Sequence, residues 1–321
     1  MDFPRAQGVS TESRPDPLSR VALKVDCDTD EGTREGIPRL LEIFAARGIR
    51  ATFFFTLGPD RSGVAIRRVF TQKGFLAKMF RSRAPALYGW RTMLAGTLLP
   101  APMIGARASG EMREAAKAGH FTGVHGWDHV RWHDELDRMS LEEIRADYGR
   151  AHAEYLRILG LPARASAAPG WTVNARSLEA QEERSLLFTS DTRGGSYFFP
   201  QAGGRTFRTL EIPTTLPTLD ETLAWPSLRS DADQRELFRK AARGTQVHTI
   251  HAEVEGRSKA ALFASILDAW LADGVAFPLL SDLAREVLAH SDALPARPVT
   301  RTTLPGRAGF VATGWPELAG S

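Results

Sequence analysis

The chain has 321 residues, of which 43 % are hydrophobic and 25 % are charged, and its formal net charge is +3. This is the composition of a globular protein, and it excludes a chain that is disordered or of low complexity throughout. The one cysteine, Cys27, excludes an internal disulfide. Because the sequence lacks a run of about eighteen apolar residues, we expect no helix that crosses a membrane.

The chain begins with a polar segment. Residues 1–19 are rich in Pro, Ser and charge, so we expect a disordered lead-in without the apolar core of a secretory signal. Residues 61–110 contain nine Lys or Arg, no Asp or Glu, and several aromatic residues. Basic charge interleaved with aromatic side chains favours an insertion at a membrane interface. A solvated basic insertion whose aromatic residues pack on the core is the alternative.

Strands and helices alternate along the rest of the chain. Short apolar runs predict strands at 21–28, 51–58, 121–125, 163–171, 186–192 and 245–251. Amphipathic periodicity predicts helices at 37–49, 109–120 and 140–160, and the segment 275–288 continues the alternation. The third helix opens on Ser140 and Glu143, which are spaced as a capping box. The alternation predicts a parallel α/β sheet, open or closed into a barrel, with the chemistry at the carboxyl ends of its strands.

Acidic residues gather at the end of the first predicted strand, in VDCDTDEG. Because side chains alternate along a strand, Asp26 and Asp28 share one face with Lys24, and Cys27 takes the other face. Two carboxylates on one face repel each other unless a cation or a proton offsets their charge. The D-x-D-x-D spacing does not indicate an EF-hand, because the later Gly and Glu of that loop are missing. A solvated polar strand end is the alternative.

The pentapeptide HGWDH places His125 and His129 four residues apart. If this segment turns helical, both imidazoles lie on one face and reach one ion. Imidazole is a ligand for zinc, cobalt, manganese or iron. The Glu of an H-E-x-x-H metalloprotease is missing, so the upstream aspartates would have to supply a general base. Two histidines and one carboxylate would hold a metal with positions left for water and substrate; two ordinary histidines are the alternative.

A third candidate lies in QVHTIHAEVEG. His248 and His251 point to opposite faces of the predicted strand, and His251, at the strand end, is the candidate for chemistry. We interpret His248 as a structural histidine. Other catalytic templates are missing from the sequence, which has neither a G-x-S-x-G elbow nor a Walker A loop.

Taken in order, these motifs resemble those of the polysaccharide deacetylase family, the metal-dependent N-deacylases of carbohydrate esterase family four. The resemblance covers residues 21 to about 310 and rests on VDCDTDEGTREG, LYGWRTMLAG, HGWDH, AAPGW, SDTRG and TIHAEVEG. It implies an α/β fold, a distorted (β/α)7 barrel with a basic and aromatic insertion. The expected organisation is one catalytic domain at 20–310, with the insertion at 61–110 and a tail at 311–321.

The resemblance also implies a role for each matching residue. Asp26 would be the general base and His251 the general acid. One divalent metal ion, either zinc, manganese or cobalt, would be held by Asp28, His125 and His129.

Further residues would contact the substrate or orient the base. The substrate contacts would come from Trp171 after the Pro-Gly turn, Asp191, Lys24 and Glu253. Most of the family has an Arg two residues before the Pro, where it orients the base, but this chain has Ala167. Arg193 or Lys24 would supply the charge instead, and we expect Arg193 to be the catalytic residue of the two.

Within the family, the motifs are most similar to the branch that removes the formyl group from undecaprenyl-phosphate-linked 4-deoxy-4-formamido-L-arabinose, for lipid A modification and polymyxin resistance. This implies a peripheral enzyme on the cytoplasmic face of the bacterial inner membrane. Its partners would be the lipid-linked sugar and the anionic membrane surface. We expect no obligate protein partner, and no nucleic acid, because the basic segment lacks a recognised binding module. The alternatives are a deacetylase of another N-acyl sugar and a non-catalytic binder of carbohydrate or lipid phosphate.

Overall fold

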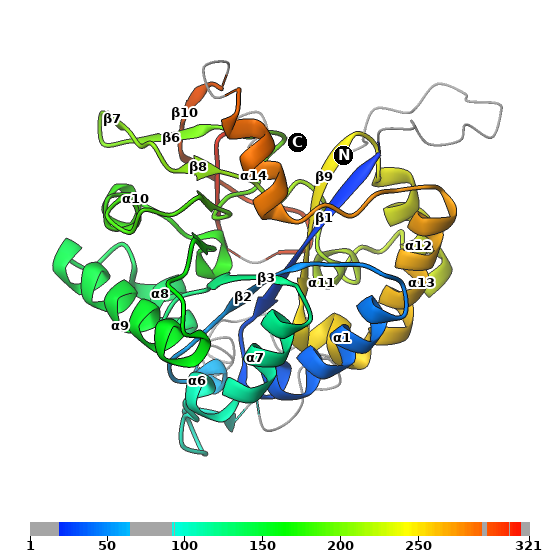
Figure 1. Cartoon of the computed structure of the whole chain (residues 1–321), viewed down its shortest axis with the longest axis horizontal. Helices are drawn as coiled ribbons and strands as arrows, with labels where there is room; N and C mark the ends of the chain where they lie inside the picture. Colours follow the sequence, from blue (N-terminus) through cyan, green and yellow to red (C-terminus); the bar gives the residue numbers. More distant parts are fainter. Residues whose placement is uncertain (1–18, 65–91, 93, 291–293, 308, 316–321) are drawn as a thin grey trace.

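The computed structural model describes residues 19–64, 92, 94–290, 294–307 and 309–315 (Figure 1). The expected lead-in, apart from Ser19, and most of the basic insertion, including the greater part of LYGWRTMLAG, lie outside the described residues. Among the helices of the described ranges, none has the length and hydropathy that crossing a membrane requires.

Seven parallel strands of the described chain form one sheet. They are β1 (Arg20–Cys27), β2 (Thr52–Phe55), β3 (Phe121–Val124), β4 (Ala165–Ser166), β5 (Phe188–Thr189), β8 (Leu210–Glu211) and β9 (Thr245–His251). The order across the sheet is β8-β5-β4-β3-β2-β1-β9, so β8 and β9 are its edges. After β8, the backbone N–H groups of Thr215 and Leu216 donate to the carbonyl oxygen of Val247 in β9, at 3.0 and 3.1 Å. These bonds join the two edges and close the distorted (β/α)7 barrel that the resemblance predicted.

Helices surround the barrel (Figure 1). The longer ones are α1 (Ile37–Ala45), α7 (Ser109–Lys117), α9 (Leu141–Leu159), α10 (Ala175–Glu182), α12 (Asp231–Ala241), α13 (Ala260–Ala272) and α14 (Leu280–Leu288). Loops that follow strands contain α6 (Ile104–Arg107), α8 (His129–Glu135), α11 (Leu219–Thr222) and helical turns at Gly32–Gly36, Pro169–Trp171 and Val254–Ser258. The predicted capping box of α9 is confirmed, because Ser140 and Glu143 each accept the other's backbone N–H with a side-chain oxygen.

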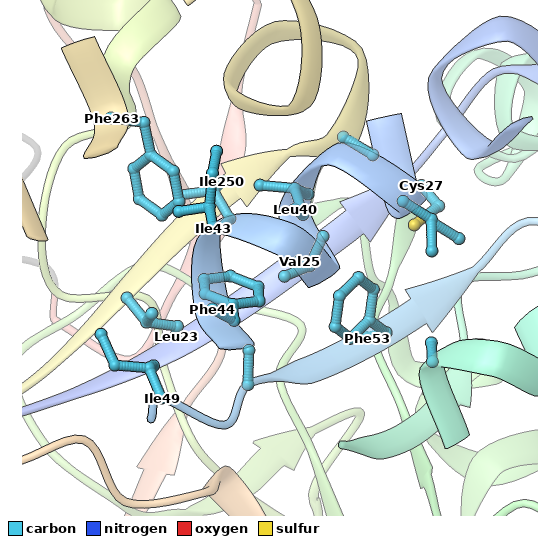
Figure 2. Packing of buried hydrophobic residues seen from close by; sticks show 14 of the residues in the cluster. Leu23, Val25, Cys27, Leu40, Ile43, Phe44, Ile49, Phe53, Ile250 and Phe263 are labelled. Carbon is cyan, nitrogen blue, oxygen red and sulfur yellow. The ribbon is translucent and has the colours of Figure 1, made fainter. Parts of the chain in front are cut away.

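The alternation predicted for the first strand is also confirmed. Three side chains of β1 point outward, those of Leu23, Val25 and Cys27. They pack against α1 and α13, where Phe44 and Phe263 lie (Figure 2). Lys24 and Asp26 occupy the opposite face, inside the barrel. A slip of β1 by one residue would turn these charged groups into the helix layer, so the apolar outer face fixes the register that presents them to the interior.

Two small sheets lie beside the barrel. One contains β6 (Phe199–Ala202), β7 (Arg205–Thr206) and β10 (Ala296–Pro298), and the other contains β11 (Thr300–Thr302) and β12 (Val311–Thr313). Residues 311–313, which we expected to begin a tail, therefore belong to the fold. They pair antiparallel with β11, and the carbonyl oxygen of Ala312 accepts the N–H of Arg193 at 2.8 Å. The strands expected at 163–171 and 186–192 are shorter in the structure, as β4 and β5. In each segment the backbone turns away from the sheet soon after the apolar residues end.

Candidate metal centre and active site

The principal site residues meet at the carboxyl ends of neighbouring strands. Asp26 lies in β1 and Asp28 follows it, His125 follows β3, and His129 opens α8. His251 ends β9, where it is the register partner of Asp26 in the adjacent strand. The HGWDH segment thus leaves a strand and turns helical, as the i, i+4 spacing of its histidines predicted.

Asp28, His125 and His129 offer ligand atoms that all lie within 4.8 Å of one another. Oδ1 of Asp28 is 3.1 Å from Nε2 of His125, and Oδ2 is 3.4 Å from Nε2 of His129. Nevertheless, Oδ1 of Asp28 and Nδ1 of His125 are buried without a hydrogen-bond partner among the described residues. Buried polar atoms normally have partners, and this donor set suits a divalent cation. The three residues therefore fit a metal ion.

The protonation states of these groups also suit a cation. Burial works against the charge of Asp28, but the neighbouring imidazoles of His129 and His125 hold the pKa of its carboxyl well below the usual value. Burial lowers the pKa of His129, which favours the neutral imidazole that a metal needs. The group therefore combines an anionic carboxylate with a neutral imidazole ligand.

Asp26 is held beside this group by a buried lysine. Nζ of Lys24 lies 3.1 Å from Oδ2 of Asp26 and donates to the carbonyl oxygen of Ser190 at 3.0 Å. The side chain of Lys24 is 0 % exposed, so its ammonium group is committed to these partners. Oδ1 of Asp26 is buried without a hydrogen-bond partner among the described residues. Lys24 thus supplies a cation next to Asp26. Ala167, at the position where most of the family has Arg, is buried and carries no charge.

Arg193 lies elsewhere. Its guanidinium group donates to both carboxylate oxygens of Glu221, at 2.7 and 3.2 Å, and to the carbonyl oxygen of Leu216 at 3.0 Å. It also stacks over the ring of Trp171, with 4.8 Å from Cζ to the ring centroid. Arg193 is not among the described residues that line the cavity next to Asp26. Of the two cations left open by the sequence, Lys24 is the one in contact with Asp26.

His251 is paired with an aspartate that the sequence analysis did not identify. Oδ1 of Asp220 lies 3.3 Å from Nδ1 of His251, and Glu255 accepts the backbone N–H of His251 at 2.9 Å. Burial alone would favour the neutral imidazole, but the charge and hydrogen bond of Asp220 raise the pKa of His251 well above its usual value. Asp220 lies in the loop segment PTTLPTLDET, where periodicity predicts no element. The carboxylate of Asp220 therefore favours the protonated form of His251, which lies beside Asp28, His125 and His129.

These groups face one cavity of about 140 Å³. Its wall is made by Asp26, Asp28 and the three histidines, together with Gly170, Trp171, Asp220, Glu253 and Arg307. Trp171 has a left-handed backbone, with φ of 52°, and its indole N–H donates to Thr214 at 3.1 Å. Such a conformation is costly for a bulky residue, so the turn after Pro169 is held by its surroundings in a shape that presents the indole to the cavity.

Asp191 and His248 are buried away from the cavity wall. Asp191 accepts a hydrogen bond from Gln181 at 2.6 Å, and burial together with the charge of Glu211 raises the pKa of its carboxyl well above the usual value. His248 lies on the outer face of β9 against Phe238, with 4.8 Å between ring centroids. Burial lowers the pKa of His248 to about 3, which agrees with our interpretation of a structural histidine.

A parallel barrel with an Asp–His–His group, a second carboxylate and a charged histidine in one cavity has the composition of a metal-dependent hydrolase. The polysaccharide deacetylase family model matches residues 19–186, more than half of the chain. The chain belongs to this family.

Two relatives extend the likeness over nearly the whole chain. The chain is 36 % identical over 298 residues to the probable 4-deoxy-4-formamido-L-arabinose-phosphoundecaprenol deformylase ArnD of Shewanella sediminis (strain HAW-EB3), across 92 % of this chain and 94 % of that protein. It is 32 % identical over 286 residues to the protein of the same name from Wigglesworthia glossinidia brevipalpis, across 88 % and 97 %. The crystal structure of a putative polysaccharide deacetylase from Mycobacterium smegmatis shares the fold, with a TM-score of 0.60 at 19 % identity, across 94 % of this chain and 100 % of that one.

Proposed function

We propose that the protein is a metal-dependent amide hydrolase that removes the formyl group from undecaprenyl-phosphate-linked 4-deoxy-4-formamido-L-arabinose, giving the amino sugar and formate. The observation that carries the chemistry is one cavity that joins the Asp28, His125 and His129 group to Asp26 on one side and His251 on the other. The choice of substrate is supported by the relatives of the same length that are named as deformylases of this sugar.

Asp28, His125 and His129 would hold a divalent cation, which would supply Lewis acidity to polarise the amide carbonyl and to make water a better acid. Zinc, manganese and cobalt all accept this set of ligands. A group of one carboxylate and two imidazoles leaves positions at the ion for water and substrate.

The two flanking residues move the protons. Lys24 holds Oδ2 of Asp26, which leaves Oδ1 to accept the proton of the attacking water. His251, kept protonated by Asp220, donates a proton to the leaving nitrogen as the C–N bond breaks. The released amine is a base that takes up a proton at neutral pH, and this favours hydrolysis over re-formation of the amide.

The size of the cavity supports a small acyl group on a single sugar. About 140 Å³ is little beside the roughly 300–1,000 Å³ of sites for drug-sized ligands. The cavity therefore accommodates the reacting end of a substrate whose remainder lies outside. A lipid-linked monosaccharide has this shape, because the rest of the molecule is its membrane anchor.

We further propose that the enzyme acts as a peripheral protein at the cytoplasmic face of the inner membrane, where residues 61–110 contact the anionic surface. The charge of this segment supports the proposal, since it contains nine Lys or Arg and no acidic residue. In the described part of the segment, Leu98 is 81 % exposed, and Leu99 and Met103 are also exposed. Exposed apolar side chains beside cations are typical of interfacial segments.

Mass spectrometry of the formamido-sugar phospholipid, incubated with the metal-loaded protein, tests the proposal. We expect the loss of the formyl group and the appearance of formate, with neither product after metal removal. The Asp26→Asn variant, which retains the three metal ligands, should bind the metal and release little formate. An acetamido analogue that is hydrolysed faster than the formamido substrate would instead favour a deacetylase of another N-acyl sugar.

A further inference from the structure

A β-turn near the C-terminus brings a cation to the cavity. The N–H of Arg307 donates to the carbonyl oxygen of Leu304 at 3.2 Å, and Gly306 has φ of 84°. Pro at the second position and a left-handed Gly at the third are the residues that a type II turn requires. A Cβ at Gly306 would also lie 2.4 Å from the carbonyl oxygen of Glu221. The sequence Leu-Pro-Gly-Arg is therefore suited to pack against α11 with Arg307 at its end.

The turn is fixed to the barrel beside the catalytic groups. The indole N–H of Trp225 donates to the carbonyl oxygen of Pro305 at 3.2 Å. The guanidinium group of Arg307 lies over the ring of Trp171, with 4.6 Å from Cζ to the ring centroid, and donates to the carbonyl oxygen of Gly170 at 3.4 Å. Arg307 thus lines the same cavity as Asp28, His125 and His129, although it lies beyond the residues that the family model matches.

Arg307 lies near two carboxylates of α11, those of Glu221 and Asp220. Both carboxylate oxygens of Glu221 already accept hydrogen bonds from Arg193, at 2.7 and 3.2 Å, and one accepts the N–H of Thr218 at 3.0 Å. Nη1 of Arg307 is 4.0 Å from the same carboxylate, at the outer limit of an ion pair. The charge of Arg307 also helps to lower the pKa of Asp220 in the same cavity wall. The side chain of Arg307 is 17 % exposed, and at such a partly desolvated wall an anion would be bound more strongly than in water.

We propose that Arg307 binds the phosphodiester anion that joins the sugar to its lipid, and so selects a phosphate-linked sugar over a neutral one. The assignment rests on the proposed deformylase function. With the formamide directed at Asp28 and the two metal-binding histidines, the sugar ring lies along Trp171 and its linking phosphate reaches the guanidinium group. Arg suits this task because its planar fork donates two parallel hydrogen bonds to phosphate oxygens.

The test compares two soluble substrates that carry the same formamido sugar. One has a phosphodiester to a short prenyl chain, and the other is the neutral methyl glycoside. The parent protein should prefer the phosphodiester in kcat/KM. In the Arg307→Gln variant this preference should fall by about tenfold or more, as expected for the loss of a charge-assisted hydrogen bond. Arg307→Lys, which keeps the charge without the fork, should retain part of the preference.

A matched control and a folding measurement complete the experiment. Arg301 lies on the neighbouring β11, is exposed and forms an ion pair with Asp137. The Arg301→Gln variant should keep the preference of the parent protein, and all variants should bind one equivalent of metal. Equal losses of kcat/KM for both substrates in Arg307→Gln, or an unchanged preference, would overturn the assignment alone. A parent protein that hydrolyses neither substrate would overturn the proposed function and the assignment with it.

Discussion

The pairing of Asp220 with His251 makes a quantitative prediction for the pH dependence of turnover. Replacing Asp220 by Asn keeps the size of the side chain and removes the charge that lies 3.3 Å from the imidazole. Burial lowers the pKa of the His251 imidazole, and in this variant only the smaller effects of Asp28 and Glu253 are left among the causes that raise it. We therefore expect the Asp220→Asn substitution to lower the pKa of His251.

The size of the effect follows from the strength of the contact. A hydrogen bond to a charged partner contributes about 1.5–3 kcal/mol, and about 1.4 kcal/mol corresponds to a tenfold change in an equilibrium constant. On the alkaline side, the protonated fraction of His251 should therefore fall by about ten- to a hundredfold. A general acid must be protonated, so activity is lost as the pH rises through its pKa. In Asp220→Asn, the falling alkaline limb of kcat should therefore lie at lower pH than in the parent protein.

The assay is formate release as a function of pH, with metal content measured at each end of the range. Asp137→Asn provides a control, because Asp137 is an exposed carboxylate that forms an ion pair with Arg301 outside the cavity. Its profile should match that of the parent protein. An alkaline limb that stays in place in Asp220→Asn would refute the inference that Asp220 keeps His251 protonated.

Three further predictions concern other parts of the molecule. Lys24→Met should lower kcat by about a hundredfold with normal metal content, because Asp26 loses the cation that holds Oδ2; loss of metal would show instead that Lys24 organises the metal group. Arg193→Ala should lower the free energy of unfolding by about 3–5 kcal/mol, since it leaves the buried carboxylate of Glu221 without its ion-pair partner. If this variant unfolds like the parent protein but has lost turnover, Arg193 acts in catalysis. Combined charge reversal should be made at Arg67, Arg68, Lys78 and Arg81. It should weaken binding to anionic liposomes by about 1 kcal/mol for each cation at the surface. Unchanged binding would exclude this segment as the membrane contact.

The meeting of Asp28, His125 and His129 was predictable because these residues follow simple rules of backbone geometry. Asp28 comes at the end of an apolar strand, and His125 and His129 are spaced for one face of a helix. Parallel strands end at one edge, so residues at the ends of β1, β3 and β9 had to meet. The fold was predictable on the same basis, and the strand expected at 163–171 contains the shorter β4. The strand β8 was not predicted, because its two residues are too few to show a period.

The remaining residues depend on tertiary packing that no local pattern reports. Asp220 lies in the short helix α11 and Arg307 ends a β-turn, and each is positioned at the cavity by contacts with distant parts of the chain. Asp191 follows a strand like the true cavity residues do, yet it faces Glu211 in the protein interior. Position at a strand end therefore restricts a side chain to one edge of the barrel, without deciding whether it points to the cavity. Lys24 and Arg193 were distinguishable only by their distances to Asp26.

The contact between the edges of β8 and β9, here called the seam, separates the site residues into two groups. The sheet supports these two groups unequally. The ion-binding side rests on β1, β2 and β3, which pair continuously. Asp220 belongs to the stretch that follows Thr215 and Leu216, whose two backbone bonds to Val247 join the barrel edges together with side-chain bonds of Thr214 and Thr215 to β9. Opening of this seam on warming would separate Asp220 from His251 before it disturbed the ion-binding side. On heating, the protein should therefore lose the proposed proton donation by His251 while Asp28, His125 and His129 still bind the proposed metal ion.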